Sequence, residues 1–220
     1  MNSTHTAVLK EEKSRNAGLL PSLRGLLELP SVYNLWWKAV GGPSWANVLV
    51  SEYIQPQVGT RILEIGCGPG NIAGYLQQSE YVGFDISSKY IEIARKRYPR
   101  AQFVCERVGK FSLAAQQSFE TVLGIGIVHH LDDFEATQLF QIAYEALKPG
   151  GKLITFDGVW TERQSSVARW FLARDRGVHV RNEMEYVGIA SRVFANVKPT
   201  VRQDLLRIPY THLILECVRC

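Results

Sequence analysis

Short apolar runs alternate with longer amphipathic stretches between Arg61 and Phe156, and this rhythm limits the possible folds more than any other feature of the sequence. Each apolar run has the length of a buried strand, and the stretch after it repeats apolar residues at helical spacing. Such βα units build parallel sheets that carry helices on both faces. The sequence therefore predicts an α/β fold with a doubly wound, Rossmann-like sheet.

The elements of this core can be placed by residue number. Strands are expected at 61–65, 81–85, 102–105, 121–127 and 152–156, and helices at 71–78, 87–98 and 133–147. In the last helix the expected apolar face consists of Phe134, Leu139, Ile142, Ala143 and Leu147. The Pro149-Gly150 pair after it is a strong helix stop.

The flanking segments follow other patterns. Residues 1–16 are polar and read as a flexible tail, 19–40 as short helices, and 43–53 as a helix that begins at Pro43. After Asp157 the rhythm changes, and helices at 165–173 and 182–195 separate the fifth strand from strands at 201–208 and 211–218. We predict one domain over 17–220.

Composition narrows the class of protein. The chain has 220 residues, of which 46% are hydrophobic and 21% charged, as in ordinary soluble domains. No run approaches the roughly 20 apolar residues of a membrane span, and the polar first residues do not form a secretory signal. A net charge of +4 is too small for a nucleic-acid footprint. We therefore expect no membrane and no nucleic-acid partner; the oligomeric state is open.

Four cysteines occur, and two of them, Cys67 and Cys105, fall in the predicted sheet region. This favours reduced thiols and a cytoplasmic location over a disulfide framework. Cys217 and Cys220 form a CxxC pair, but no second ligand pair accompanies it. We predict no metal site.

A glycine-rich turn follows the first strand and precedes a helix. Gly66, Gly68 and Gly70 allow a tight turn and a close approach of the backbone to a ligand. Asp85 ends the second strand, where a carboxylate can accept hydrogen bonds from both hydroxyls of a ribose. Together the two features indicate a nucleoside cofactor.

With two further motifs, the sequence resembles the class I S-adenosylmethionine-dependent methyltransferases over roughly residues 61–156. In order, the motifs are Leu63-Glu64-Ile65-Gly66-Cys67-Gly68-Pro69-Gly70, Gly83-Phe84-Asp85-Ile86-Ser87, Gly126-Ile127-Val128-His129-His130-Leu131 and Leu147-Lys148-Pro149-Gly150-Gly151. The resemblance implies a seven-stranded sheet with an antiparallel last strand. It also implies S-adenosylmethionine as the cofactor and transfer of a methyl group to an O, N or C atom.

The resemblance assigns roles to individual residues. Glycines 66, 68 and 70, with Cys67 among them, would lie along the methionine part of the cofactor, and Glu64 would order their loop. Asp85 would hold the ribose and Ile86 would pack on the adenine. After the third strand, Glu106 or Arg107 would meet the adenine amino group, because the usual Gly-Asp pair is not present.

The fourth strand would end beside the sulfonium. This places Gly124, Ile125 and Gly126 near the cofactor and His129 and His130 near the acceptor. An imidazole is suited to take a proton from the attacking atom near neutral pH, so either histidine is a candidate general base. The alternative is that both belong to a loop fixed by the aspartates before the next helix.

The segments that flank the core on either side indicate where the acceptor is recognised. Residues 17–58 are expected to form an N-terminal helical lid and 158–197 an acceptor-recognition insertion. The insertion interleaves Trp160, Trp170 and Phe171 with several arginines, which fits a small anionic or aromatic acceptor. The competing interpretation is a solvated helix face whose aromatic residues pack inward.

Two other functions remain as alternatives. A nicotinamide-dependent oxidoreductase also combines a glycine turn with an acidic residue, although the turn here is GxGxG and not GxGxxG. A protein that binds S-adenosylmethionine without methylating an acceptor would show the same motifs, because fold and cofactor do not fix the chemistry. The motif set favours the methyltransferase.

Overall fold

A computed structural model describes residues 42–107, 118–175 and 177–220. The chain divides into two compact units, Met1–Gly42 and Pro43–Cys220, and the second is described by itself below. The predicted tail at 1–16 and the predicted helices within 19–40 lie outside the described residues. In the described part of the chain, no helix has both the length and the apolar character needed to cross a bilayer.

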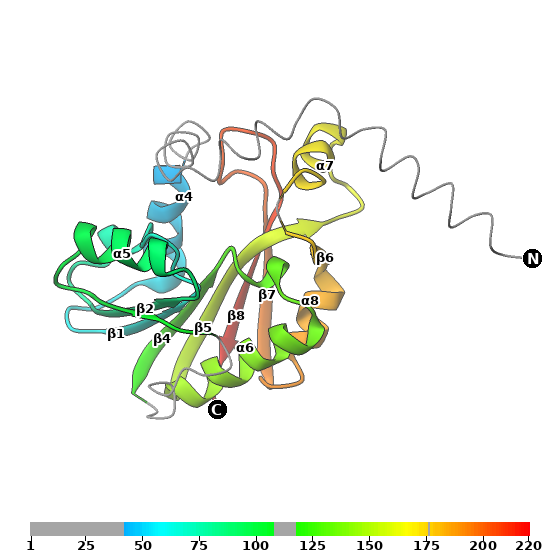
Figure 1. Ribbon diagram of the computed structural model, residues 1–220. Helices are drawn as coiled ribbons and strands as arrows, with labels where there is room; N and C mark the ends of the chain where they lie inside the picture. The colour runs from blue at the N-terminus through cyan, green and yellow to red at the C-terminus, as the bar shows by residue number, and fades with distance from the viewer. Residues whose placement is uncertain (1–41, 108–117, 176) are drawn as a thin grey trace, which may run out of the picture. The chain divides into compact units, whose positions relative to one another are not determined.

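The second unit is built on one large mixed sheet (Figure 1). Its strands are β1 (Arg61–Ile65), β2 (Glu80–Asp85), β3 (Gln102–Cys105), β4 (Phe119–Ile125), β5 (Leu147–Trp160), β6 (Arg181–Asn182), β7 (Asn196–Arg202) and β8 (His212–Val218). The order is β3-β2-β1-β4-β5-β8-β7, and the short β6 pairs with β5. β1 to β5 are parallel, whereas β8 runs antiparallel to β5 and β7. This confirms the predicted Rossmann-like sheet with an antiparallel last strand.

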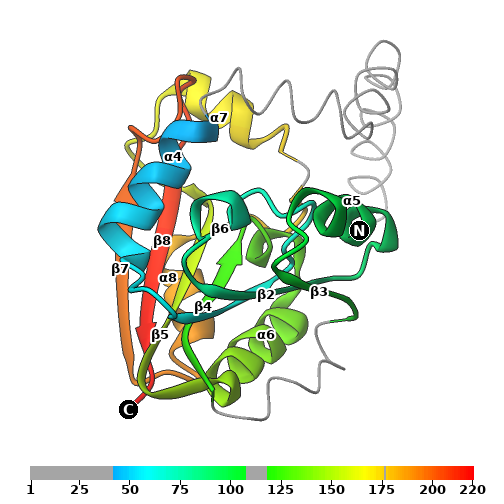
Figure 2. The ribbon, with the colours of Figure 1, turned by 90° about the vertical axis from the view of Figure 1, so that its left-hand side faces the viewer.

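Helices cover both faces of the sheet (Figures 1 and 2). They are α4 (Gly42–Val48) with the π-helical turn η1 (Leu49–Ile54), the 3-10 turns η2 (Ala73–Tyr75) and η5 (Val128–His130), α5 (Ser88–Arg97), α6 (Asp133–Ala146), α7 (Ser166–Leu172) and α8 (Glu183–Ala190). α6 and α8 lie on one face, and α4 and α5 on the other. Strand order reverses between β1 and β4, and ligands of such sheets bind at this point, at the carboxyl ends of the strands.

Local sequence signals explain where the helices begin. The Ser87 side chain accepts a hydrogen bond from the Tyr90 amide at the start of α5. α6 and α8 each begin with a reciprocal capping box, Asp132 with Glu135 and Asn182 with Glu185. These caps orient the first turns of α6 and α8, which border the candidate site.

The face of α6 that packs on the sheet differs from the prediction at one residue. Leu139 and Ala143 are fully buried, as expected, but Phe134 is 70% exposed. Phe134 precedes the buried Ala136 by two positions, which turns it about 200° around a helix of 3.6 residues per turn. The expectation that Phe134 joins the core was therefore wrong.

Two predicted elements also differ from the structure. The helix expected at 71–78 is reduced to η2, and a Cβ atom at Gly74 would lie only 2.8 Å from the Tyr98 hydroxyl oxygen, so close packing and a flexible glycine replace a regular helix here. The strand expected at 201–208 lies earlier, at Asn196–Arg202, as the outermost strand β7. An edge position tolerates Pro199, which has no amide hydrogen to donate.

Candidate active site

The glycine-rich turn after β1 has the backbone that its sequence requires. Gly66, Gly68 and Gly70 have φ angles of 72°, 51° and 75°, a region that residues with side chains rarely adopt. The Gly66 and Cys67 amides donate to the Phe84 carbonyl oxygen at 2.9 and 3.0 Å, which ties the turn to the end of β2. In the part of the chain that the structure describes, no atom beyond the two chain neighbours of Gly68 lies within 4 Å of the place its Cβ would occupy, so the backbone is open to a ligand there.

Asp85 joins the glycine turn to the end of β2. Its Oδ2 accepts the Gly68 amide at 2.9 Å and its Oδ1 accepts the Ser87 amide at 2.8 Å. Each carboxylate oxygen has a further lone pair, so the side chain can still accept two hydroxyl groups. The neighbouring Ile86 is 61% exposed and offers an apolar surface beside this carboxylate. Both residues therefore fit a ribose and an adjoining base.

The turn after β4 lies directly against the glycine turn. A Cβ atom at Gly66 would be 2.3 Å from Cδ1 of Ile127, and one at Gly124 would be 3.5 Å from Cγ2 of the same residue. Gly126 has a φ of 65°, and its amide donates to the Phe156 carbonyl oxygen at 2.7 Å. Three motifs that are distant in sequence therefore meet at the carboxyl ends of β1, β2 and β4.

Of the segment after β3, the structure describes Glu106 and Arg107, the two predicted contacts to the adenine. The Glu106 amide donates to the Asp85 carbonyl oxygen at 3.0 Å, which brings this segment beside β2. The Glu106 carboxylate accepts the Arg107 amide at 2.8 Å, and the Arg107 side chain is exposed. Both predicted residues thus lie at the edge of the site, next to a segment, 108–117, that is outside the described residues.

Glu64 is buried beneath the glycine turn, with an exposed fraction of 4%. The Tyr81 hydroxyl donates a hydrogen bond to its Oε2. Burial raises the pKa of Glu64 to about 8, and the nearby Asp85 charge adds to this, while the Tyr81 hydrogen bond opposes it. The protonated form of Glu64 is therefore favoured at neutral pH. This residue lies at the end of β1, immediately before the glycine turn.

The two predicted catalytic histidines have different environments. His129 is buried, and its Nδ1 lies 2.7 Å from Asp157 Oδ1 while its Nε2 lies 3.4 Å from Asp175 Oδ1. Burial alone would lower the pKa of His129, but the hydrogen bonds to Asp157 and Asp175 outweigh it and raise the pKa to about 10. His130 is exposed, with its ring centroid 4.2 Å from that of His129. His129 is thus an imidazolium between two carboxylates at neutral pH.

Asp175 connects His129 to the start of β8. Its Oδ2 accepts the Tyr210 hydroxyl at 2.6 Å, and its Oδ1 accepts the Gly177 amide at 3.1 Å. Burial would raise the pKa of Asp175, but the contacts with His129, Tyr210 and Gly177 hold it well below the usual range. Burial, together with the charge and the hydrogen bond of Asp175, raises the pKa of Tyr210, which stays a phenol and a hydrogen-bond donor.

Arg181 holds the segment before α8 against the turn after β4. Its side chain is only 8% exposed and donates to the carbonyl oxygens of Val128 and Leu131 at 3.2 and 2.8 Å. It also pairs with Asp133 Oδ1 at 2.8 Å. The His179 amide donates to the His129 carbonyl oxygen at 3.0 Å, so two segments 50 residues apart in sequence are fixed to each other.

The other arginines of the insertion make local contacts. Arg169 donates to the Thr161 carbonyl oxygen and lies over the Trp160 ring, and Arg174 lies 3.9 Å from the Trp170 ring centroid. Arg176 is outside the described residues. The contacts of Arg169 and Arg174 favour the solvated-face interpretation over convergence on an anion, but Trp170 is 51% exposed and does not pack inward as that interpretation expected.

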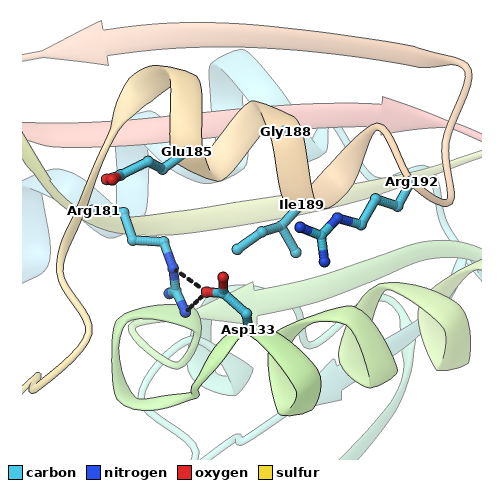
Figure 3. Close-up of a pocket in the computed structure, with 6 residues that line it drawn as sticks. All are labelled: Asp133, Arg181, Glu185, Gly188, Ile189 and Arg192. Carbon is cyan, nitrogen blue, oxygen red and sulfur yellow. Dashed lines mark hydrogen bonds and ion pairs between the residues drawn. The ribbon is translucent and has the colours of Figure 1, made fainter.

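A small pocket of about 280 Å³ lies between the first turn of α6 and α8. Figure 3 shows Asp133 and Arg181 paired at one end of it and Arg192 at the other. The Glu185 carboxylate, also at its rim, accepts a hydrogen bond from the Asn182 amide in the capping box of α8. None of the predicted cofactor-binding residues lines this pocket, so it is separate from the glycine turn.

Sequence reasoning missed four residues that the structure brings to His129 and its neighbours: Asp157, Asp175, Tyr210 and His212. Asp157 immediately follows the predicted fifth strand, so its place at a carboxyl end was a usable signal. The other three come from segments whose position depends on how the insertion folds, which local patterns do not encode.

The glycine turn, the acidic end of β2 and the antiparallel last strand define a class of α/β proteins that bind a nucleoside cofactor at the carboxyl ends of their strands. Comparison with known proteins makes the class specific. Residues 62–151 match the family model described as a methyltransferase domain. The matched segment, which holds the glycine turn, Asp85 and the turn after β4, is therefore a methyltransferase domain, and the cofactor of this class is S-adenosylmethionine.

Individual relatives agree on the domain and differ in what they act on. The chain is 29% identical over 119 residues to the human probable tRNA methyltransferase 9B, covering 53% of this chain and 25% of that protein. It is 33% identical over 152 residues to Caenorhabditis elegans phosphoethanolamine N-methyltransferase 2, covering 64% and 33%. The chain thus spans only a quarter to a third of these relatives.

A solved structure supports the fold. Haemonchus contortus phosphoethanolamine N-methyltransferase 2, in complex with phosphomonomethylethanolamine and S-adenosylhomocysteine, superimposes with a TM-score of 0.64 at 18% identity. The match covers 79% of this chain and 52% of that one. At this level of identity it speaks for the shared fold alone.

Proposed function

We propose that the chain binds S-adenosylmethionine along the turn after β1 and transfers its methyl group to a small-molecule acceptor. The observation that carries this proposal is the convergence of three motifs: Gly68 donates to Asp85, and Ile127 packs on Gly66. The cofactor-binding residues are Glu64, Gly66, Cys67, Gly68, Gly70, Asp85, Ile86, Glu106, Arg107, Gly124, Ile125 and Gly126.

S-adenosylmethionine supplies a methyl carbon that its positive sulfur activates for attack. The protein has to align the acceptor, exclude water and remove a proton from an attacking hydroxyl or ammonium. Of the two predicted bases, His130 is exposed whereas both ring nitrogens of His129 face carboxylates. We therefore assign proton transfer to His130 and the positioning of the turn after β4 to His129.

The surrounding assignments belong to the same proposal. Residues 158–197 contribute to acceptor recognition. The lid expected at 17–58 and the tail expected at 1–16 of the single domain 17–220 fall on residues that, up to 41, lie outside the described part of the chain. The names of the relatives extend from tRNA to phosphoethanolamine, and the modest net charge of +4 supports a small molecule over a nucleic acid. Four free cysteines support a reducing compartment, the cytoplasm.

Calorimetry tests the cofactor site directly. The full chain is titrated with S-adenosylmethionine and, separately, with NAD, alongside Asp85→Ala. Because the variant loses charged hydrogen bonds worth roughly 1.5–3 kcal/mol, we expect its Kd for S-adenosylmethionine to rise about 10- to 100-fold. Asp204→Ala, which removes an exposed carboxylate paired with Arg202, is the matched control and should leave the Kd unchanged.

Other outcomes would redirect the proposal. Binding of NAD alone would identify an oxidoreductase. Binding of S-adenosylmethionine without release of S-adenosylhomocysteine, in the presence of either a pool of small metabolites or total tRNA, would identify a non-methylating protein. Transfer of labelled methyl groups to tRNA alone would contradict the small-molecule acceptor.

A further inference from the structure

The small pocket between α6 and α8 presents opposite charges at its two ends. Its lining consists of Asp133, Arg181, Glu185, Gly188, Ile189 and Arg192, and we call it the α6–α8 pocket. Two carboxylates and two guanidinium groups make the lining neutral as a whole. Figure 3 shows that these groups are segregated, because Asp133, Arg181 and Glu185 lie toward one end and Arg192 lies at the other. The first end is therefore negative and the second positive.

The Arg181 guanidinium has no hydrogen-bonding capacity left for a ligand. Its Nε and Nη2 donate to Asp133 Oδ1 at 3.1 and 2.8 Å. The other N–H groups donate to three backbone carbonyl oxygens, those of Val128, Leu131 and His179. Together these bonds use all five N–H donors of the side chain. The negative end can therefore offer a ligand only acceptors, Asp133 Oδ2 and Glu185 Oε1, which accept no hydrogen bond from the described residues.

Arg192 supplies the donors at the opposite end. It follows Ser191, the C-terminal cap of α8. Figure 3 shows its guanidinium turned toward Ile189 and the interior of the pocket. Within the described part of the chain, no hydrogen bond or ion pair engages this guanidinium. Its planar pair of N–H groups matches the oxygens of a carboxylate or a phosphate.

Gly188 leaves the space between the two ends open. It lies inside α8 with a negative φ, and apart from the backbone of α8 no described atom lies within 4 Å of the position its Cβ would occupy. Neither backbone conformation nor packing therefore requires glycine here, although alanine is the better residue in a helix interior. The pocket accounts for the glycine, because a side chain would enter its volume of about 280 Å³, which equals roughly nine water molecules of the liquid.

We propose that the α6–α8 pocket binds a small zwitterion, with its ammonium group beside Asp133 and Glu185 and its carboxylate or phosphate group beside Arg192. An anion alone would face the two carboxylates, and a cation alone would leave Arg192 without a partner. The buried Ile189, which is 3% exposed, offers an apolar surface to the short carbon chain between the charged groups.

This site is distinct from the proposed methyl-transfer site and goes beyond it. None of the predicted cofactor-binding residues lines the α6–α8 pocket. The two places are nevertheless connected, because Arg181 pairs with Asp133 in the pocket and donates to the carbonyl oxygens of Val128 and Leu131. A bound zwitterion would therefore lie one contact away from the turn that carries His129 and His130.

An NMR titration tests the requirement for two opposite charges. The 15N-labelled full chain is first saturated with S-adenosylhomocysteine, so that the amino-acid part of the cofactor site is filled. It is then titrated with three zwitterions, 4-aminobutanoate, 6-aminohexanoate and 3-aminopropylphosphonate. Butylamine and butanoate, which each carry one of the two charges, are the controls. The signals followed are the Gly188 amide and the Arg192 Nε–H, identified by their loss in Gly188→Ala and Arg192→Gln.

We expect at least one zwitterion to shift both signals, with an affinity several-fold above that of butylamine or butanoate. Gly188→Leu, followed at Arg192, fills the pocket, and Arg192→Gln, followed at Gly188, removes its positive end. Each should weaken binding about tenfold or more. Arg100→Gln, which removes an exposed arginine that does not line the pocket, is the charge-matched control and should leave the affinity unchanged.

The zwitterions also distinguish the two anionic groups. A response to the phosphonate alone identifies a phosphate-bearing ligand, and a response to the amino acids alone identifies a carboxylate. Three results would overturn the proposal: no response to any zwitterion, an equal response to a singly charged control, or binding that persists in Gly188→Leu. Because the signals come from the pocket itself, these results stand whether or not the chain transfers methyl groups.

Discussion

Gly66 in the glycine turn and Gly59 before β1 have similar backbone conformations but different surroundings, so substituting each can separate the effect of conformation from the effect of packing. Gly66 and Gly59 have similar φ angles of 72° and 79°. An added Cβ at Gly66 would lie 2.3 Å from Ile127 Cδ1, whereas no atom lies within 4 Å at Gly59. Both alanine variants carry the conformational cost of about 1–2 kcal/mol, but only one disturbs the contact between the two turns.

We therefore predict that Gly66→Ala weakens S-adenosylmethionine binding at least tenfold, while Gly59→Ala lowers the melting temperature and leaves the affinity unchanged. Calorimetry and thermal unfolding on the same samples measure both effects. Equal affinities in the two variants would show that the contact between Gly66 and Ile127 does not shape the cofactor site.

At the residue scale the sequence predicts which residues lie at the strand ends better than it predicts the environment of His129. Gly66, Asp85 and Gly126 lie in local motifs whose spacing fixes their place at strand ends, so they could be found without a structure. The environment of His129 could not, because Asp157 and Asp175 reach it from 28 and 46 positions away. The same pattern of residues is compatible with a neutral base or with the imidazolium found here.

At the scale of the elements, the insertion is fixed by its contacts with the turn after β4. The surroundings of Gly177 show how closely the two segments pack. A Cβ atom at Gly177 would lie 2.0 Å from Cδ2 of His129, which has no room to move between its two carboxylates. We predict that Gly177→Ala destabilises the protein by roughly 1–3 kcal/mol, as overpacking of a dense interior does.

Gly188 in the middle of α8 is the matched control. Apart from the backbone of α8 itself, no atom of the described residues lies within 4 Å of the position its Cβ would occupy, and alanine is favoured over glycine in a helix interior by about 1 kcal/mol. Gly188→Ala should therefore stabilise the protein. Urea unfolding of both variants measures the two signs, and a stable Gly177→Ala would show that the insertion can shift away from His129 at little cost.

The elements with strong periodicity or clear caps were predicted well, and the exceptions have tertiary causes. β1 and β3 match their expected bounds, and α5, Ser88–Arg97, falls within the expected 87–98. β5 runs from Leu147 to Trp160, well beyond 152–156, because it pairs with β4 at Leu147, with β8 up to Gly158 and with β6 at Trp160. These partners are distant in sequence, so no local window contains the information.

For the molecule as a whole, two buried groups, Glu64 and His129, determine how stability depends on pH above about 6.5. Below that value the lowered pKa of the buried His212 makes stability rise with pH and opposes Glu64. Glu64 has a folded pKa of about 8 against an ordinary 4.5, so the folded state retains a proton that the unfolded chain has lost, and stability falls as pH rises between these values. His129 has a folded pKa of about 10 against 6.5. Its stabilising contribution is complete below 6.5 and disappears as pH rises to 10.

The windows of the two groups overlap between about pH 6.5 and 8, where each reduces stability by up to about 1.4 kcal/mol per pH unit. We therefore predict that the free energy of unfolding declines from about pH 6.5 to alkaline pH. Glu64→Gln, whose amide oxygen can still accept from Tyr81, should flatten the lower part of the curve, and His129→Gln the upper part. Urea unfolding at a series of pH values measures the slopes. Wild-type stability that rises across this range would contradict both assignments, because it would require the unfolded chain to bind more protons than the folded one.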